Sequence, residues 1–378
     1  MEGNTVENLN FKIKDGVLEY SLLNDVNITV PDGVTDIGRG AFSPASPFEF
    51  DYVVRINLPD TVEKIRESAF EKRKQLRYIN LPEKLVSIGK RAFALCSNLV
   101  SAEIPNTVEK MGREAFFGCL NLKKVKISKG LKQIKSSMFK GCVELDNVEI
   151  PESVSSIGSF AFEECFELKK IKIPDCVRNI GDSVFEKCYS LKSITLPKSL
   201  TNVNQNTFKH CRSLKDVAFQ SEISNVDGYA FYGCECLKEI NLPKSVKSIG
   251  AFCFANCKSL KKVDLKDGIE VIGMGAFKKC KSLESITLPN SVKTVESHAF
   301  SSCPALKKIN LSNGMEIISS WTFEELDSLT ELTIPKSVAK IQKCAIANCK
   351  SLKTVRVPKD CVLFDGWMVE CNANVIAY

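Results

Sequence analysis

The chain alternates apolar and polar positions in a block of 23 residues that recurs without insertion from residue 70 onward. Leucine comes six residues after the phenylalanine that opens each block, and further apolar residues follow at fixed places. A block of this length cannot bury its own apolar side, so neighbouring blocks must stack to form a core. The pattern therefore predicts a solenoid. The phenylalanines lie at positions 70, 93, 116, 139, 162, 185, 208, 231, 254, 277, 300 and 323.

The segment "LKEINLP" at 237–243 represents the strand of one block. Ile240 and Leu242 alternate with polar residues, which predicts a short strand with one face inward. Pro243 ends it, because proline cannot donate to a strand ladder. Gly250 follows the last apolar residue of the block and predicts a tight bend. Equivalent strands then pair in parallel, giving about 13 coils of 23 residues.

The two ends of the chain depart from the repeat. The segment "FKIKDGVLEY" at 11–20 alternates around Asp15 and Gly16, a dipeptide typical of hairpins. We expect a β-hairpin cap over 1–27, repeats over 28–364 and a C-terminal cap over 365–378, all in one continuous domain. Phe42 precedes Phe70 by 28 residues, so a five-residue insertion falls within 43–54.

The segment "LKEINLPKSVKSIGAFCFANCKSL" at 237–260 resembles the BspA-like leucine-rich repeats, and the resemblance covers roughly residues 28–364. The resemblance implies a right-handed, curved solenoid. It implies a parallel β-sheet on the concave face, with short strands, turns and 3-10 segments on the convex side. It also implies binding of other macromolecules, often as a surface adhesin.

Composition adds limits on location and partners. Hydrophobic residues make up 44% of the chain and the net charge is +7, which permits acidic partners without demanding nucleic acid. The first ten residues are polar, without the basic and apolar regions of a signal peptide. No apolar run approaches the roughly 20 residues of a membrane helix. We expect a cytoplasmic protein without membrane insertion, or a cell-surface or secreted one if a leader has been removed.

Cysteine is the residue with the most reactive chemistry in the repeat. Close ligand pairs are missing apart from Cys234 and Cys236, so no metal site is predicted. Stacked cysteines would lie about 5 Å apart at Cα, but parallel side chains do not bring their sulfurs together. We therefore expect a reduced, buried ladder rather than a disulfide ladder. Eleven of the 17 cysteines lie three residues after a block's first residue: Cys96, Cys119, Cys142, Cys165, Cys188, Cys211, Cys234, Cys257, Cys280, Cys303 and Cys349.

An enzyme is the least favoured class. His210 and His298 lie in different blocks, and neither has a nucleophile motif beside it. Glycine pairs at 38–40 and 273–275 do not continue as a phosphate-binding loop. No catalytic residue and no cofactor is predicted.

Lysines gather on two predicted strands, as Lys124 and Lys126 in one block and Lys170 and Lys172 in another. A basic stripe for polyanions is one interpretation. The block between them places Glu149 in the row Lys126–Glu149–Lys172, which favours ordinary cross-strand charge pairing. Aromatic residues are scarce in these strand slots, which argues against single-stranded nucleic acid.

The insertion carries aromatic residues at Phe48, Phe50 and Tyr52. They serve either as a binding loop or as a plug over the first coils, and the sequence leaves both open. In later blocks the outward-facing position of the predicted strand holds residues of different types. This variety suits specific recognition better than polymer binding. These slots are Thr195, Asn241, Asp264, Thr287 and Asn310.

The leading prediction is a non-catalytic scaffold that binds an unidentified protein ligand through the concave sheet and the 43–54 insertion. The alternative is a cell-surface adhesin for host matrix or other cells. No nucleic acid partner is expected, and the oligomeric state is not predicted.

Overall fold

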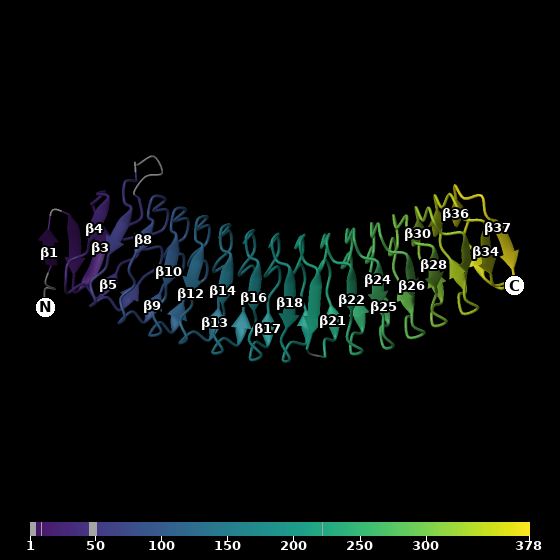
Figure 1. Ribbon diagram of the computed structural model, residues 1–378, viewed down its shortest axis with the longest axis horizontal. Helices are drawn as coiled ribbons and strands as arrows, with labels where there is room; N and C mark the ends of the chain where they lie inside the picture. Colours follow the sequence, from purple (N-terminus) through teal and green to yellow (C-terminus); the bar gives the residue numbers. More distant parts are fainter. Residues whose placement is uncertain (1–4, 9, 45–50, 221) are drawn as a thin grey trace. The chain divides into compact units, whose positions relative to one another are not determined.

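The computed structural model describes residues 5–8, 10–44, 51–220 and 222–378, and these form 37 strands and no helix (Figure 1). The predicted parallel solenoid is confirmed. The expectation of 3-10 segments is wrong, because two-residue strands and turns take their place in the described residues. One row of these strands, from β5 (Asp36–Ile37) to β35 (Val362–Leu363), has one member per coil and fifteen members in the described residues, against the 13 coils expected. The thirteen blocks in strict register begin at Phe70 and end with the block of Ile346, so they leave out the coil of Phe42, before the insertion, and the last coil, which departs from the repeat.

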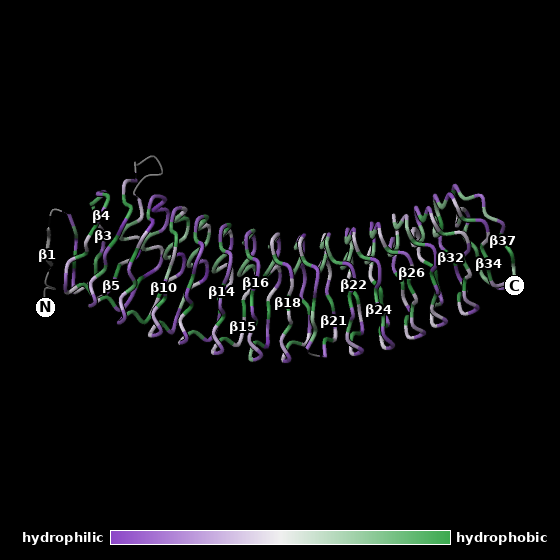
Figure 2. The backbone as a smooth tube through the Cα atoms, in the orientation of Figure 1, coloured by the Kyte–Doolittle hydropathy of each residue, from purple (hydrophilic) through white to green (hydrophobic). Residues whose placement is uncertain are grey.

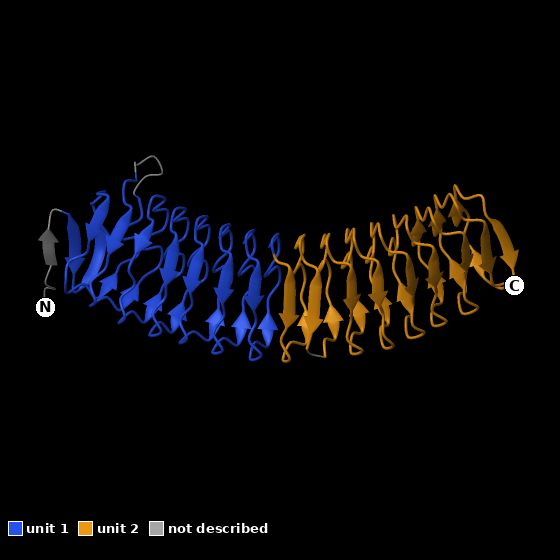
Figure 3. Ribbon diagram, in the orientation of Figure 1, with its two compact units in different colours: residues 1–190 blue, residues 191–378 orange. Residues whose placement is uncertain are grey.

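The coils form two compact units, residues 1–190 and 191–378 (Figure 3). Each unit has its own sheets and its own core. In every coil the tube changes between apolar and polar stretches, as the sequence pattern requires (Figure 2). The expectation of one continuous domain stays a prediction.

Unit 1 contains four sheets. A seven-stranded sheet has the order β1-β2-β3-β5-β7-β9-β11, and its first three strands pair antiparallel while the rest are parallel. Its strands are β1 (Thr5–Asn8), β2 (Phe11–Lys14), β3 (Val17–Ser21), β5 (Asp36–Ile37), β7 (Lys64–Ile65), β9 (Ser87–Ile88) and β11 (Lys110–Met111). A parallel sheet continues this row with β13 (Gln133–Ile134), β15 (Ser156–Ile157) and β17 (Asn179–Ile180).

The other row of unit 1 holds longer strands in two parallel sheets. The first sheet contains β4 (Asn27–Thr29), β6 (Arg55–Asn57) and β8 (Tyr78–Ile79). The second contains β10 (Ser101–Glu103), β12 (Lys124–Lys126), β14 (Asn147–Glu149) and β16 (Lys170–Lys172).

Unit 2 repeats both rows. Its longer strands are β18 (Ser193–Leu196), β20 (Asp216–Phe219), β22 (Glu239–Asn241), β24 (Lys262–Asp264), β26 (Ser285–Thr287), β28 (Lys308–Asn310), β31 (Glu331–Thr333), β34 (Thr354–Val357) and β37 (Asn374–Ala377). Its two-residue strands are β19 (Asn202–Val203), β21 (Asn225–Val226), β23 (Ser248–Ile249), β25 (Val271–Ile272), β27 (Thr294–Val295), β29 (Ile317–Ile318), β32 (Lys340–Ile341) and β35 (Val362–Leu363). A third row appears in the last coils, with β30 (Phe323–Glu324), β33 (Ile346–Ala347) and β36 (Met368–Val369).

The repeat phenylalanines form the spine of each core. All twelve from the first block onward are fully buried, and so is Phe42. Within each unit, their rings stack on those of the next coil; Phe277, for example, lies 5.5 Å from Phe254 and 5.6 Å from Phe300 between ring centroids. Because each ring covers the next, the spine links consecutive coils through dispersion and offset stacking.

Glycine after the two-residue strand has a different role from the predicted bend. A Cβ atom on Gly250 would lie 2.4 Å from the backbone nitrogen of Gly228, and one on Gly89 would lie 2.5 Å from the backbone of Arg66. These glycines allow close approach of consecutive coils. The left-handed turn falls two residues later, at Arg91 (φ 55°) and Phe252 (φ 53°).

Candidate functional site

The strands β10, β12, β14 and β16 of unit 1 present a continuous row of polar side chains to solvent. In each strand the first and third residues are exposed and the middle one is buried, as with Val125 and Val148. The alternation follows from strand geometry, because successive side chains point to opposite faces. We call the exposed residues of these four strands the long-strand face of unit 1.

Parallel pairing fixes the neighbours on this face. Lys124 and Lys170 lie on either side of Asn147, and Lys126 and Lys172 on either side of Glu149. The register is the one that the 23-residue spacing predicts. All four predicted lysines are therefore on one face, with an amide or a carboxylate between each pair.

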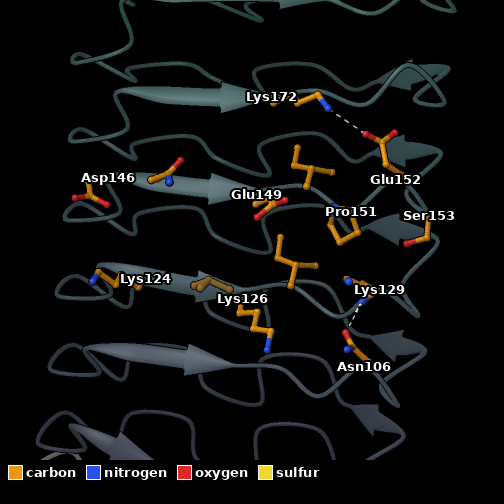
Figure 4. Close-up of a pocket in the computed structure, with 14 residues that line it drawn as sticks. Asn106, Lys124, Lys126, Lys129, Asp146, Glu149, Pro151, Glu152, Ser153 and Lys172 are labelled. Atoms are coloured by element: carbon orange, nitrogen blue, oxygen red, sulfur yellow. Dashed lines mark hydrogen bonds and ion pairs between the residues drawn. The ribbon is translucent and has the colours of Figure 1, made fainter.

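A groove of about 980 Å³ runs over β12 and β14 and the turns that follow them. Figure 4 shows Lys124 and Lys126 on one strand and Lys172 two strands away, with Glu149 between them. Lys170 lies on the same face beside Asn147, outside the groove lining. The lining consists of Asn106, Lys124, Val125, Lys126, Ile127, Lys129, Asp146, Asn147, Glu149, Ile150, Pro151, Glu152, Ser153 and Lys172.

The charges in this groove are only partly paired. Lys172 Nζ lies 3.2 Å from Glu152 Oε1, in the turn after β14. Among the described residues, Lys124, Lys126 and Glu149 have no ion pair. The expected neighbours across the strands are therefore correct, but the expected ion pairs between them do not form. The long side chains reach toward turns or solvent instead. The groove keeps lysines and a carboxylate available to a ligand.

The turns beside the groove were missed at the sequence level. Asn106 Oδ1 accepts a hydrogen bond of 3.1 Å from the backbone N–H of Lys129 (Figure 4). The buried Ser128 hydroxyl donates to the Val108 carbonyl at 2.7 Å and accepts from Gly130 N–H at 3.0 Å. These bonds hold the wall of the groove in place. The sequence does contain a pattern that could have indicated these turns. Each block has a further polar residue three positions after the last exposed residue of its strand, as Asn106 follows Glu103.

The predicted insertion site is only partly described. Phe48 and Phe50 lie outside the described residues. The Tyr52 side chain is 57% exposed, and its backbone N–H donates to Asn24 Oδ1 at 3.1 Å. Asp51 turns inward, where its carboxylate lies 3.3 Å from the guanidinium of Arg73 and accepts from Gln75 N–H at 3.0 Å. The choice between loop and plug stays a prediction for the two phenylalanines.

Arg73 occupies the place that cysteine has in later coils. Within each unit, the ladder thiols donate to the carbonyl of the phenylalanine one coil earlier, as Cys96 does to Phe70 at 3.1 Å and Cys280 to Phe254 at 3.2 Å. The Arg73 side chain, 3% exposed, donates through Nε to the carbonyl of Phe42, the equivalent acceptor. The guanidinium then pairs with Asp51, so the first repeat block and the insertion share one buried ion pair.

The predicted slots of unit 2 also lie on longer strands. Thr195 is on β18, and Asn241 on β22 pairs in register with Asp264 on β24. Asp264 forms an ion pair with Lys266, so it is less available than the others.

Thr287 and Asn310 lie side by side on β26 and β28, where Asn310 Nδ2 donates to Thr287 Oγ1 at 2.9 Å. Asn310 also lines a groove of about 720 Å³ together with Lys308, Glu331 and Tyr378. This groove is a smaller counterpart of the one in unit 1.

The cysteines behave as core residues. All seventeen are free thiols, and the eleven of the ladder are fully buried. Burial raises the pKa of Cys96, Cys119 and Cys142 well above the ordinary value. The half-buried Cys371 differs, because a hydrogen bond with Cys349 lowers its pKa to about 7.

The two histidines have aromatic neighbours. His298 stacks on Trp321 and its Nδ1 lies 3.2 Å from Glu324 Oε2, while His210 meets the Tyr232 ring edge-on at 5.2 Å. Within the described residues, no three His, Cys, Asp or Glu side chains are grouped to hold a metal ion. The same residues include no helix long and apolar enough to cross a bilayer.

Stacked coils of a longer and a shorter parallel strand, with phenylalanine, leucine and cysteine ladders inside, define a leucine-rich-repeat solenoid. A family model described as "BspA type Leucine rich repeat region (6 copies)" matches residues 11–145, 132–261 and 247–368. The chain belongs to this family of leucine-rich repeat proteins.

Solved structures share the fold. A leucine-rich repeat protein from Bacteroides ovatus is 24% identical with a TM-score of 0.72, over 100% of this chain and 98% of that one. The pneumococcal vaccine antigen PcpA is 20% identical with a TM-score of 0.57, over 100% and 99%. A leucine-rich repeat protein from Eubacterium ventriosum is 20% identical with a TM-score of 0.51, over 93% and 96%. A search of curated proteins finds no match.

Proposed function

We propose that this protein is a non-catalytic scaffold that binds a segment of another protein along the long-strand face of unit 1. The groove over β12 and β14 is the observation that carries the proposal. It combines a floor of buried strand residues with lysines, carboxylates and amides at its rim. Such a mixture of apolar floor and polar rim is typical of protein interfaces.

Rigidity supports this role. The groove lies on parallel strands whose middle residues are buried, and its wall is held by the hydrogen bonds of Asn106 and Ser128. A preformed surface loses little conformational entropy on binding, so more of the contact energy remains for affinity. Side chains of an extended ligand would meet rows that repeat at the strand spacing of about 4.8 Å.

Charge favours a polypeptide over a polyanion. Asp146, Glu149 and Glu152 line the groove among its lysines and would repel a phosphate backbone. The lining holds no aromatic residue on which bases could stack. A peptide that presents both charge signs can satisfy Lys126 and Glu149 together. The unpaired lysines add a preference for acidic side chains.

Display of random peptides tests the proposal. We expect the wild-type protein to select acidic or mixed-charge peptides, and the double variant K124E/K126E to bind them at least about tenfold more weakly. The control variant K110E/K132E changes net charge equally at exposed lysines outside the groove lining. It should bind like the wild type.

Two outcomes would reject the proposal. Equal loss in both double variants would show that net charge, and not the groove, governs binding. A wild-type protein that ignores peptides but binds single-stranded oligonucleotides or heparin, with steep dependence on salt, would favour a polyanion site instead.

A further inference from the structure

Two arginines of unit 1 lie against the same exposed tyrosine. The guanidinium carbon of Arg55 on β6 lies 4.8 Å from the centroid of the Tyr78 ring on β8, and that of Arg77 lies 5.6 Å from it. Arg55 and Tyr78 are in-register partners across the two strands, and Arg77 directly precedes Tyr78 in the chain. Cation–π attraction holds both guanidinium groups beside one ring. We call these three residues the arginine–tyrosine site.

The site is not neutralised within the protein. In the part of the chain that the structure describes, Arg55 and Arg77 form no ion pair and donate no side-chain hydrogen bond. Arg66 differs, since its guanidinium lies 2.7 Å from the Asp36 carboxylate. Tyr78 is 39% exposed, and its hydroxyl has no partner among the described residues. Two cations and one hydroxyl are therefore free to meet a ligand.

The in-register neighbours of both arginines are uncharged. Arg77 lies between Val54 and Val100, because its N–H donates to the Val54 carbonyl at 2.8 Å and its carbonyl accepts from the Val100 N–H at 3.3 Å. Arg55 lies between Asn27 and Tyr78. The groove over β12 and β14 is different, since a carboxylate lies between two of its lysines. The arginine–tyrosine site therefore favours an anion, and the groove favours both charge signs.

An anion with two charges fits this site better than one with a single charge. The two guanidinium groups repel each other, because they lie against one ring and the Debye length is about 10 Å at 0.1 M salt. A phosphate monoester carries about −1.5 to −2 charge at pH 7 and has three acceptor oxygens. It can accept from both guanidinium groups and from the tyrosine hydroxyl together. A carboxylate, a sulfate ester or a phosphodiester brings one charge and leaves one arginine without a counter-charge.

We propose that the arginine–tyrosine site binds a phosphate monoester on a side chain of the protein ligand. The inference rests on the proposed function, because the site lies in the same row of longer strands as the groove, with β10 between β8 and β12. The two coils from Tyr78 to Lys124 correspond to about 10 Å at the strand spacing. An extended peptide spans that distance with about three residues. The ligand thus carries its phosphate about three residues from the segment in the groove.

Three synthetic peptides test this proposal by fluorescence anisotropy. Each has an acidic and basic segment for the groove, and three residues from it a phosphotyrosine, a sulfotyrosine or an unmodified tyrosine. We expect the phosphotyrosine peptide to bind at least about tenfold more tightly than the unmodified one, the size of a charge-assisted contact. The sulfotyrosine peptide should lie between them, because its ester carries one charge. Equal affinity for all three peptides would overturn the proposal.

A matched pair of variants locates the phosphate. R55Q/R77Q should lose the gain from phosphorylation, whereas R113Q/R178Q should keep it. The control removes the same charge at two exposed arginines of unit 1 that also have no ion pair among the described residues. Arg55→Lys keeps the charge without the planar fork and should lose part of the gain. Circular dichroism checks that each variant is folded.

The outcomes separate this inference from the proposed function. A gain from phosphorylation that survives in R55Q/R77Q, or that is lost equally in R113Q/R178Q, would overturn the arginine–tyrosine site. The groove would be unaffected by either result. The proposed function fails by a different result, in which K124E/K126E binds the unmodified peptide as tightly as the wild type does.

Discussion

The phenylalanine spine allows a quantitative test in unit 2. Phe277 is fully buried between Phe254 and Phe300, with ring planes within 7° and 2° of parallel. Phe277→Ala removes the ring and both stacking contacts and leaves a cavity that the coil spacing cannot close. We expect the free energy of unfolding to fall by about 3–5 kcal/mol. The two ring pairs contribute about 0.5–1.5 kcal/mol each to that loss.

Phe277→Leu separates stacking from burial. Leucine keeps most of the apolar contact but has no ring, so the expected cost is about 1–3 kcal/mol. Urea unfolding measures both variants through the fluorescence of Trp321 and Trp367, the two tryptophans of the chain, both of which lie in unit 2. An unchanged slope against urea shows that only stability has changed.

The reasoning fails if Phe277→Ala costs less than about 1 kcal/mol, because a buried ring with two neighbours cannot be removed so cheaply. It also fails if the leucine and alanine variants unfold at the same urea concentration. In that case the apolar atoms beyond Cβ would contribute nothing to the free energy of unfolding.

Two further predictions concern the departures from the repeat. Arg73→Ala leaves Asp51 buried and unpaired, so thermal unfolding should show a loss of about 3–5 kcal/mol. Arg73→Cys with Asp51→Asn should recover most of it, and failure to recover would contradict the assignment of the loss to the unpaired carboxylate and the missing donor. Iodoacetamide should label Cys371 about tenfold faster at pH 8 than at pH 6, because its thiolate forms as pH rises through its pKa of about 7. The buried ladder thiols should react only in denaturant, including Cys119 and Cys142, whose pKa burial raises, and equal labelling of native ladder thiols would contradict their burial.

The candidate site was predicted in part. The sequence placed Lys124, Lys126, Lys170 and Lys172 on one face, because a fixed period in a parallel sheet sets which residues are neighbours. It did not predict that Lys172 reaches Glu152 in a turn, since side-chain contacts depend on distances across the folded surface. For the same reason, the turn residues beside the groove were not singled out.

The sequence by itself determined the coil, the strand within it and the buried ladders. Its 23-residue period places equivalent residues next to one another wherever coils stack, so the pattern contains the core and the register. The tertiary structure alone decided how the exceptions are accommodated. Arg73 takes the donor role of cysteine, and Gly250 permits close backbone approach. Each depends on atoms that approach across coils at one place, where no neighbouring repeat supplies the same information.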